Sequence, residues 1–442
     1  MRFELLIVNS QTACTVNIEL INTGSELMLG FVLNSHQAWL CRQLADLGYP
    51  VTRQSAVHDS GAAIQQIVGE ALSRADLVIV TGGLGPTSDD LTRDVVAALV
   101  RRPLHEDPAV LACIERFFAA RNRPMPARAG IQALVPEGAI VLPNAHGTAP
   151  GLVLDLDPNP CRQDGKAALL VMLPGPPREL RPMFSEQVVP MLQRRFPLQA
   201  PFACRVLKTT GLPESLLEDK IAGPLASLVA VGLVIGYCAR IGEVEVRLAA
   251  QGPNAAQIVE EAEQIVRSIV GRNIFGMNQD ELAGVLVRLL TERGQTVALA
   301  ESCTGGYIAH RLTNVAGASA VFLSGLVTYS NQAKQRLLGV KTETLAAHGA
   351  VSEPTAREMA EGARSRVGAD FALAVTGIAG PTGGTPGKPV GTVYIALASG
   401  QETIVERYLN PYDRETFKRV TSQQALELLR QNLLMQKDTS AP

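Results

Sequence analysis

The chain has 442 residues, about three times a typical domain, so two to four domains are expected, each large enough to bury a core. Hydrophobic residues make up 46% and charged residues 19%, which excludes an intrinsically disordered protein. Aromatic residues make up only 4%, and this low share favours α/β layers over an all-β sandwich. The net charge of −2 argues against a nucleic-acid partner and favours small ligands.

The cysteine spacing and the hydropathy of the sequence indicate the compartment in which the protein is expected. The seven cysteines are scattered singly, without a C-x-x-C pair or a Cys/His cluster, which argues against a disulfide framework and against structural zinc. The apolar run 5–8 is too short for a secretory signal, and no apolar stretch is long enough to cross a bilayer. We therefore expect a soluble cytoplasmic protein without a membrane partner, and we interpret the first sixteen residues as an added arm.

Strand and helix patterns alternate over residues 17–190. Apolar and alternating runs predict strands over 17–24, 50–57, 77–81 and 169–173, and helical spacing predicts helices over 34–47, 61–74 and 89–101. This βαβ order predicts a three-layer α/β domain with a parallel sheet, followed by the Pro-rich segment 174–182.

The rest of the chain divides into a small module and a second large domain. Residues 200–270 predict an α+β module, with strands over 203–209, 231–238 and 243–250, a short helix from Pro213 and a helix over 254–270. Residues 271–280 are expected to form a linker. Residues 280–434 predict another three-layer α/β domain, with helices over 280–293 and 414–434 and strands over 296–300, 323–329, 371–375 and 392–398.

The first chemical motif is a glycine-rich turn, Gly82-Gly83-Leu84-Gly85, between a buried strand and the predicted helix that begins with Asp89 and Asp90. Glycines let backbone N–H groups approach an anion, and carboxylates beside such a turn can hold a divalent cation against a pyrophosphate. The spacing fits neither a dinucleotide fingerprint nor a Walker loop. The alternative is a tight turn in which Thr87 or Ser88 caps the helix and the two aspartates complement its dipole.

Further segments give this motif a family resemblance. With Thr23-Gly24-Ser25-Glu26-Leu27 and Val57-His58-Asp59, it resembles molybdopterin-binding domains, and Leu173-Pro174-Gly175-Pro176-Pro177-Arg178-Glu179-Leu180 makes it similar to the N-terminal half of the CinA (competence/damage-inducible) family. The resemblance implies an ADP-ribose pyrophosphatase that yields AMP and ribose 5-phosphate, with a divalent metal (Mg, Mn or Co) and K as an optional further ion. It makes Asp90 and Asp59 catalytic; the expected metal ligands are Asp90, Asp89 and Asp59, and the expected nucleotide contacts are Glu26, Asn34, Gly82, Gly83 and Gly85.

The second motif is Glu301-Ser302-Cys303-Thr304-Gly305-Gly306, between a strand and a helix. A serine there faces backbone N–H groups that could stabilise an oxyanion, and Tyr329 or a desolvated Lys334 could deprotonate it. The alternatives are that Ser302 is a helix cap, Tyr329 is partly buried and Lys334 is solvated. Cys303 is either a rival nucleophile or a small buried hydrophobe.

A third segment, 376–392, is rich in glycine without P-loop spacing, and is either a mobile surface excursion or an anion-binding lid. With Thr328–Lys334 and the serine motif, it resembles the CinA C-terminal domain. That resemblance implies an amidohydrolase that converts nicotinamide mononucleotide (NMN) and water to nicotinate mononucleotide and ammonia without a cofactor. It makes Ser302 the nucleophile and Lys334 with Tyr329 the base system; the expected substrate contacts are Thr304, Gly305, Gly306, Thr376, Gly377, Gly380 and Arg414.

Two points qualify this resemblance. The family usually has Gly-Asp-Arg before its last helix, whereas this chain has Tyr412-Asp413-Arg414, so the loop is expected to differ while Arg414 is kept. The middle module resembles a KH fold but lacks a basic G-x-x-G loop, so RNA binding is not expected.

A homodimer is expected. Two other functions stay open: a competence-related scaffold, and an N-terminal nucleotide-binding module without turnover.

Overall fold

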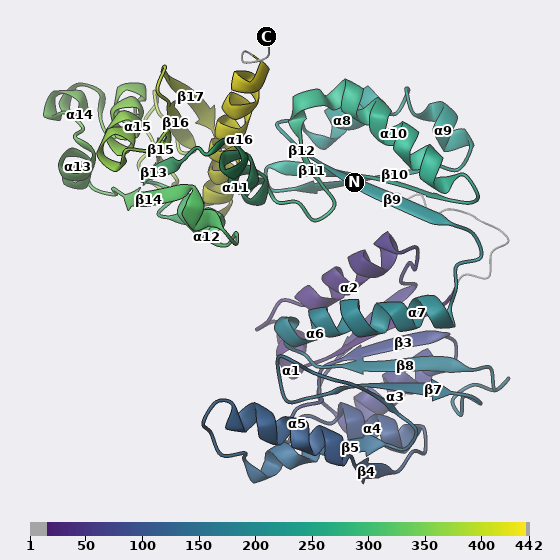
Figure 1. Ribbon diagram of the computed structural model, residues 1–442. Coiled ribbons are helices and arrows are strands. Elements are labelled where there is room, and N and C mark those ends of the chain that lie inside the picture. The colour runs from purple at the N-terminus through teal and green to yellow at the C-terminus, as the bar shows by residue number, and fades with distance from the viewer. Residues whose placement is uncertain (1–15, 439–442) are drawn as a thin grey trace. The chain divides into compact units, whose positions relative to one another are not determined.

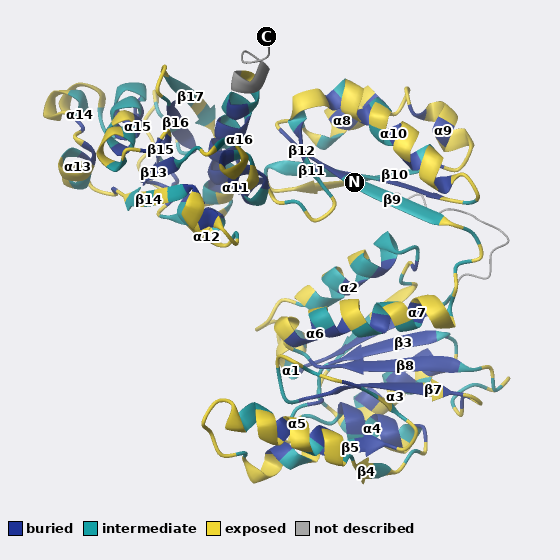
Figure 2. Ribbon diagram, viewed as in Figure 1, coloured by how far each residue is buried: buried dark blue, intermediate teal, exposed yellow. Residues whose placement is uncertain are grey.

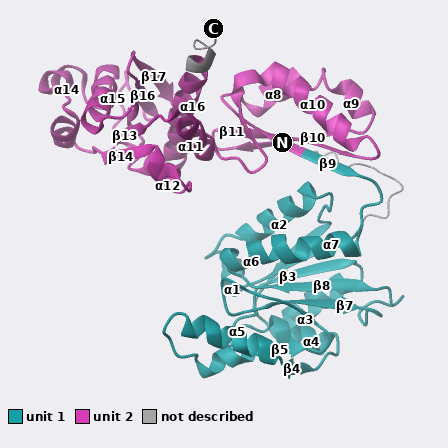
Figure 3. Ribbon diagram, viewed as in Figure 1, with its two compact units in different colours: residues 1–204 teal, residues 205–442 magenta. Residues whose placement is uncertain are grey.

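The computed structural model describes residues 16–438, which form two compact units divided after Cys204 (Figure 3). The predicted N-terminal arm and its apolar run lie outside the described residues, apart from Val16. The six cysteines within this range are free thiols, and Cys14 lies outside it. No helix among residues 16–438 is long and apolar enough to cross a membrane.

The first unit is a three-layer α/β sandwich (Figure 1). Its central sheet has the strand order β2-β1-β3-β8-β7-β6, formed by β1 (Ile18–Thr23), β2 (Arg53–Val57), β3 (Leu77–Thr81), β6 (Ile140–Leu142), β7 (Gly151–Leu156) and β8 (Ala168–Leu173). β1, β2, β3 and β8 are parallel, whereas β7 runs antiparallel to both of its neighbours, β8 and β6. The prediction of an all-parallel sheet is therefore wrong at this edge, because the connections 143–150 and 157–167 hold no crossover helix.

Helices cover both faces of this sheet, and Figure 2 shows buried strands between partly exposed helices. Leu77 and Ile79 pack toward α2 (Ser35–Asp46) and α6 (Pro177–Met183), whereas Val78 and Val80 pack toward α3 (Gly61–Leu72) and α4 (Thr92–Leu99). This alternation follows from the period of two along a strand. The remaining elements are α1 (Ser25–Met28), α5 (Pro108–Ala119), α7 (Val189–Arg195), a 3-10 helix (Ala127–Ala133), a π-helical turn (Phe184–Val188) and the two-stranded pair β4 (Leu104–Glu106) and β5 (Leu134–Pro136).

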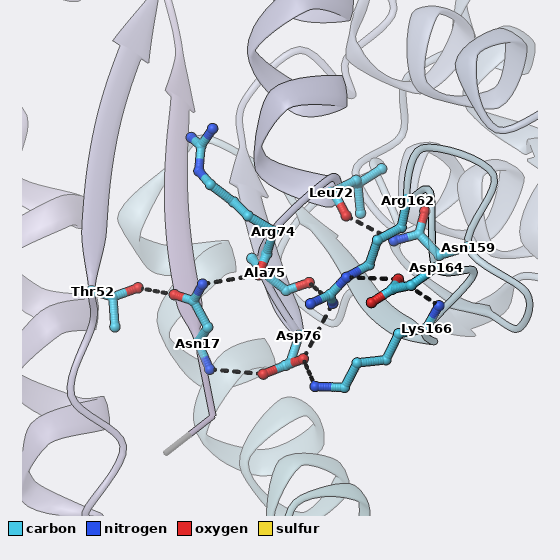
Figure 4. Close-up of polar contacts among 10 residues, drawn as sticks. All are labelled: Asn17, Thr52, Leu72, Arg74, Ala75, Asp76, Asn159, Arg162, Asp164 and Lys166. Atoms are coloured by element: carbon cyan, nitrogen blue, oxygen red, sulfur yellow. Dashed lines mark hydrogen bonds and ion pairs between the residues drawn. The ribbon is translucent and has the colours of Figure 1, made fainter. Parts of the chain in front are cut away.

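A polar network lies at the amino-terminal ends of the parallel strands (Figure 4). It is at the opposite end of β3 from the glycine-rich turn. Asp76 accepts hydrogen bonds from Lys166 Nζ at 2.7 Å and from Asn17 N at 3.1 Å, and pairs with Arg162 at 3.3 Å. Burial alone would raise the pKa of Asp76, but these hydrogen bonds outweigh it and hold that pKa below its ordinary value.

The second unit begins with the α+β module. Its sheet has the order β10-β11-β9-β12, formed by β9 (Phe202–Thr210), β10 (Val234–Arg240), β11 (Glu243–Gln251) and β12 (Ile274–Met277), with helices α8 (Glu214–Ile221), α9 (Ala226–Ala230) and α10 (Ala255–Val270). The predicted linker over 271–280 is wrong, because it contains a 3-10 turn (Gly271–Asn273) and β12, which pairs with β9. Burial of Ile274 and Phe275 explains why this segment joins the sheet.

The C-terminal part of the second unit is a second three-layer sandwich. Its sheet has the order β14-β13-β15-β16-β17, formed by β13 (Val297–Glu301), β14 (Phe322–Val327), β15 (Phe371–Gly377), β16 (Thr392–Ala398) and β17 (Thr403–Leu409). Large residues such as Leu299 and Leu373 face α11 (Leu282–Arg293), α12 (Tyr307–Thr313) and α16 (Arg414–Asp438). Alanines such as Ala300 and Ala374 face α15 (Glu353–Val367). The shorter elements are α13 (Asn331–Ala333), a π-helical turn (Lys334–Leu338), α14 (Thr342–His348) and a 3-10 turn (Ala318–Ala320).

Candidate active sites

A buried serine–lysine pair lies where β13 ends. Lys334 Nζ donates a hydrogen bond to Ser302 Oγ at 3.0 Å and another to the carbonyl of Thr328 at 2.8 Å. Lys334 is only 1% exposed, so the interpretation of a solvated lysine is wrong. Ser302 is not a helix cap either, because α12 starts at Tyr307 with Gly306 at the N-cap position.

The environment of Lys334 shifts its protonation equilibrium toward the neutral amine. Burial lowers the pKa of this ammonium from its ordinary value of 10.5, since the charged form loses its hydration. A neutral amine at 3.0 Å from a serine hydroxyl is placed to accept its proton. The pair therefore has the geometry and the protonation tendency that a serine nucleophile needs.

Glu301 holds the loop that carries Ser302. Its carboxylate, 1% exposed, accepts hydrogen bonds from the backbone N–H groups of Gly306, Ile308 and Ala309 at 3.0, 3.2 and 2.9 Å. These donors belong to the first turn of α12, whose orphan N–H groups need such partners. In the sequence Glu301 is a lone carboxylate, and its position at the end of a buried strand is the available signal.

Most backbone N–H groups of the loop 302–306 are already engaged. Ser302 N donates to the carbonyl of Val375 at 3.0 Å, Gly305 N to that of Ser302 at 3.1 Å, and Gly306 N to Glu301. Within residues 16–438, the N–H groups of Cys303 and Thr304 are the loop donors that bond to neither a backbone carbonyl nor the Glu301 carboxylate. These two groups are therefore the candidates for an oxyanion hole.

Cys303 is a core residue. It is 5% exposed and packs among Val297, Ile308 and Val375. Burial raises the pKa of its thiol to about 12, so the thiolate that a cysteine nucleophile requires is disfavoured. Of the two interpretations of Cys303, the structure favours the small buried hydrophobe.

Tyr329 and Arg414 form a separate contact near the same strand ends. The Tyr329 ring is 62% exposed, not partly buried, and its hydroxyl accepts a hydrogen bond from Arg414 Nη2 at 2.6 Å. Arg414 Nη1 donates to the carbonyl of Gly380 at 3.0 Å, so the guanidinium joins the glycine-rich segment to Tyr329. The structure thus brings Lys334 to Ser302, but places the Tyr329 hydroxyl at Arg414. Asp413 caps α16, accepting from the N–H groups of Glu415 and Thr416.

The other residues expected to contact the C-terminal substrate surround this centre. Thr304 is fully buried, and its hydroxyl has no partner among the described residues. Thr376 donates to the carbonyl of Ala350 at 2.7 Å, and Gly377 ends β15. Gly305 and Gly306 adopt left-handed backbone conformations that allow the sharp turn before α12.

The N-terminal motifs enclose a cavity of about 360 Å³. The glycine-rich turn forms one wall, and five carboxylates also line the cavity: Glu26, Asp59, Asp89, Asp90 and Glu179. No lysine or arginine is among its described lining residues. Arg93, the first cation after the turn in sequence, is buried and donates to the carbonyl of Ile131 at 2.7 Å instead. The cavity is therefore strongly acidic.

Short contacts position two of these carboxylates. Asp59 accepts from Ser25 N at 2.7 Å, and Asp90 accepts from Thr87 N at 2.8 Å and from the Thr87 hydroxyl. The alternative interpretation, in which Thr87 or Ser88 caps the helix, is wrong, since α4 starts at Thr92 and its N-cap Leu91 makes no side-chain bond. A Cβ atom on Gly85 would overlap Asp90 Oδ2, so glycine is needed there for close approach.

Asn34 does not take its expected role, and Glu179 lines the cavity although no role is expected for it from the sequence. Asn34 caps α2, accepting from Gln37 N at 3.2 Å, and is not among the residues that line the cavity. Glu179, which sequence reasoning did not select, lines it and accepts from Asn144 Nδ2 at 2.8 Å. The signal for Glu179 was its place in the Pro-rich segment that follows β8.

The acidic cavity fits a divalent cation whose coordination a ligand completes. Within residues 16–438, no three His, Cys, Asp or Glu side chains gather closely enough to hold a metal by themselves. Magnesium commonly takes one or two protein carboxylates and fills its remaining positions with water and substrate phosphates. Asp90, Asp59 and Asp89 match that donor chemistry.

Comparison with known proteins agrees with this architecture. Residues 19–194 match the family described as the probable molybdopterin binding domain, residues 204–276 the damage-inducible protein CinA KH domain, and residues 279–433 the CinA C-terminal domain. A CinA-like protein of Akkermansia muciniphila is 44% identical over 93% of this chain and 96% of its own length. A protein of Symbiobacterium thermophilum, named as competence-damage inducible, is 47% identical over 86% of this chain and 88% of its own length.

One solved structure matches about a third of this chain. The competence/damage inducible protein CihA from Agrobacterium tumefaciens is 47% identical, covering 34% of this chain and 92% of its own, with a TM-score of 0.33. The two full-length relatives and the three matched domains are what identify the chain: it belongs to the CinA family.

Proposed function

We propose that the C-terminal domain is an amidohydrolase that converts NMN and water to nicotinate mononucleotide and ammonia. The observation that carries the proposal is the buried pair in which Lys334 Nζ lies 3.0 Å from Ser302 Oγ. The resemblance of the three C-terminal motifs supplies the substrate. Arg414, held between Tyr329 and Gly380, is the cation proposed to bind the NMN phosphate.

The chemistry follows from these groups. Neutral Lys334 accepts the Ser302 proton as Oγ bonds to the carboxamide carbon, and the Cys303 and Thr304 N–H groups stabilise the oxyanion. Lys334 then gives that proton to the departing nitrogen, so the C–N bond breaks and ammonia leaves. Water, deprotonated by the same amine, attacks the acyl–serine ester and releases the acid and Ser302.

The test is product analysis of the purified chain with NMN. We expect ammonia and nicotinate mononucleotide in equal amounts, and no nicotinamide, which would indicate cleavage of the glycosidic bond instead. Absence of ammonia release from NMN would contradict the proposal and favour a competence-related scaffold.

For the N-terminal domain we propose hydrolysis of ADP-ribose to AMP and ribose 5-phosphate. The supporting observation is a cavity with five carboxylates and no basic side chain among its described lining residues, because such a cavity cannot neutralise a pyrophosphate by itself. A divalent cation bound by Asp90, with Asp59 or Asp89, would neutralise the pyrophosphate and activate a water. The glycine-rich turn would present backbone N–H groups to the phosphates.

Chelation separates the two activities. EDTA is expected to stop ADP-ribose hydrolysis and to leave ammonia release from NMN unchanged, since the Ser302 mechanism uses no metal. Added Mg, Mn or Co should restore the first activity. Equal loss and equal recovery of both activities would contradict this division of the chemistry. ADP-ribose binding without turnover would instead identify a nucleotide-binding module.

A further inference from the structure

Lys418 lies beside the loop that carries Ser302. It begins the second turn of α16, and its Nζ is 3.9 Å from the position that a Cβ atom would take on Gly305. The same Nζ lies 5.9 Å from the centre of the Tyr307 ring, at the start of α12. Gly305 N donates to the carbonyl of Ser302 at 3.1 Å, so the two ends of this turn lie within about 7 Å of each other. The Lys418 ammonium is therefore close to the proposed nucleophile.

The positive charge of Lys418 has no carboxylate partner. Its side chain is half-buried, and no Asp or Glu among residues 16–438 forms an ion pair with it. Glu415, the acidic residue nearest to it in sequence, pairs with Arg419 at 2.7 Å instead. A cation that loses part of its hydration without gaining an anion is unfavourable, and a negatively charged ligand would relieve this cost.

Lys418 and Arg414 are two cations one helical turn apart on α16. Residues at i and i+4 lie on the same face of a helix. Arg414 reaches the segment after β15 and the end of β14, because it donates to the Gly380 carbonyl and to the Tyr329 hydroxyl. Lys418 reaches the loop after β13. The start of α16 thus presents both cations to the edge of the sheet at which Ser302 lies.

A phosphate monoester needs more positive charge than Arg414 alone supplies. Near neutral pH it carries a charge of roughly −1.5 to −2, whereas a guanidinium carries a single positive charge. The first N–H groups of α16 are already engaged, because the Asp413 carboxylate accepts from Glu415 N and Thr416 N. A second side-chain cation beside Arg414 therefore completes the charge balance.

We propose that Lys418 is a specificity-determining residue of the C-terminal site and binds the phosphate of the mononucleotide together with Arg414. This assignment rests on the proposed deamidation of NMN. The ribose separates the phosphate from the carboxamide, so the two cations hold one end of the substrate while Ser302 meets the other. The site then selects mononucleotides over the corresponding nucleosides, which lack the phosphate.

Steady-state kinetics with NMN and with nicotinamide riboside, its analogue without the phosphate, test this role. In Lys418→Gln we expect KM for NMN to rise roughly tenfold or more while kcat stays within about twofold of native, and KM for nicotinamide riboside to stay unchanged. Lys418→Arg should keep most of the affinity, since it retains a cation at this place. Arg419→Gln is the matched control, because this neighbouring cation is paired with Glu415, and it should behave like the native chain.

Equilibrium binding to the full chain carrying Ser302→Ala separates this inference from the proposed function, because calorimetry measures binding there without turnover. NMN should bind saturably, and adding Lys418→Gln should weaken its binding roughly tenfold, a loss of about 1.4 kcal/mol. Binding of NMN that depends on Lys418, in a native chain that releases no ammonia, would refute the proposed deamidation and support this site.

Thermal unfolding confirms that each variant is folded. The inference is overturned if NMN shows no saturable binding, or if the folded Lys418→Gln variant binds NMN as tightly as its parent. It is also overturned if the variant weakens NMN and nicotinamide riboside equally, because Lys418 would then not act on the phosphate.

Discussion

The central residue of the C-terminal site is Lys334, and its proposed role depends on the burial of its side chain away from water. It lies 32 positions from Ser302 in sequence and reaches it from the π-helical turn that follows β14. Burial favours the neutral amine, which makes the lysine a base rather than a surface cation. Composition alone predicts the opposite, because most lysines are exposed.

This environment predicts a pH dependence. Because burial lowers the pKa of Lys334, kcat/KM for NMN should rise as pH rises through that pKa and level off below 10.5, the ordinary lysine value. Lys334→Arg keeps the positive charge but cannot lose its proton, so deamidation should fall on the order of a thousandfold. A flat pH profile, or an active arginine variant, would contradict the base assignment.

Glu301 provides a second prediction at this scale. Glu301→Gln replaces one acceptor oxygen by an N–H₂ group that faces backbone donors, so unfolding free energy should fall by about 1–3 kcal/mol. The loop that carries Ser302 should also lose its fixed position, which lowers kcat more than it raises KM. Chemical denaturation and steady-state kinetics measure both effects. Native stability with native kcat would show that the three hydrogen bonds do not position the loop.

At the scale of elements, the glycine-rich turn is shaped by Asp90. Gly85→Ala should displace that carboxylate and reduce ADP-ribose hydrolysis roughly 100-fold. Gly61→Ala is the matched control, because a Cβ atom there would make only an ordinary contact, 3.6 Å from Val95. The measurement is the rate of ADP-ribose hydrolysis by the two folded variants. Equal rates for the two would show that Gly85 is not needed to position Asp90.

Sequence patterns identified the long elements because their apolar residues are periodic. β3 and α2 lie where they were expected, with Asn34 as the cap of α2. The pattern predicts a linker in place of β12 and no strand at β17, since β12 is short and β17 lacks a clean alternation of burial. Likewise, α4 starts later than predicted because Asp90 bonds back to Thr87 instead of entering the helix.

The candidate sites were only partly predictable. Family motifs pointed to Ser302, Lys334 and Asp90, but no spacing rule could show that Lys334 is buried or that Tyr329 contacts Arg414. These facts depend on packing between segments that are distant in sequence. The same holds for Glu179, which reaches the acidic cavity from the start of α6.

At the scale of the whole molecule, the two proposed sites belong to separate compact units. Asp90→Ala should therefore abolish ADP-ribose cleavage and leave NMN deamidation within about twofold of native, since independent sites with no shared residues behave additively. Parallel assays of both activities on the folded variant check this expectation. Loss of both would refute independent sites.

The most direct test of the account is ammonia release from NMN by two neighbouring variants. In Ser302→Ala the rate of deamidation should fall on the order of a thousandfold or more, while the temperature of thermal unfolding stays close to native. Cys303→Ala should keep most of the activity, because the thiol is buried and its pKa is about 12. An inactive Cys303 variant beside an active Ser302 variant would contradict the serine–lysine mechanism.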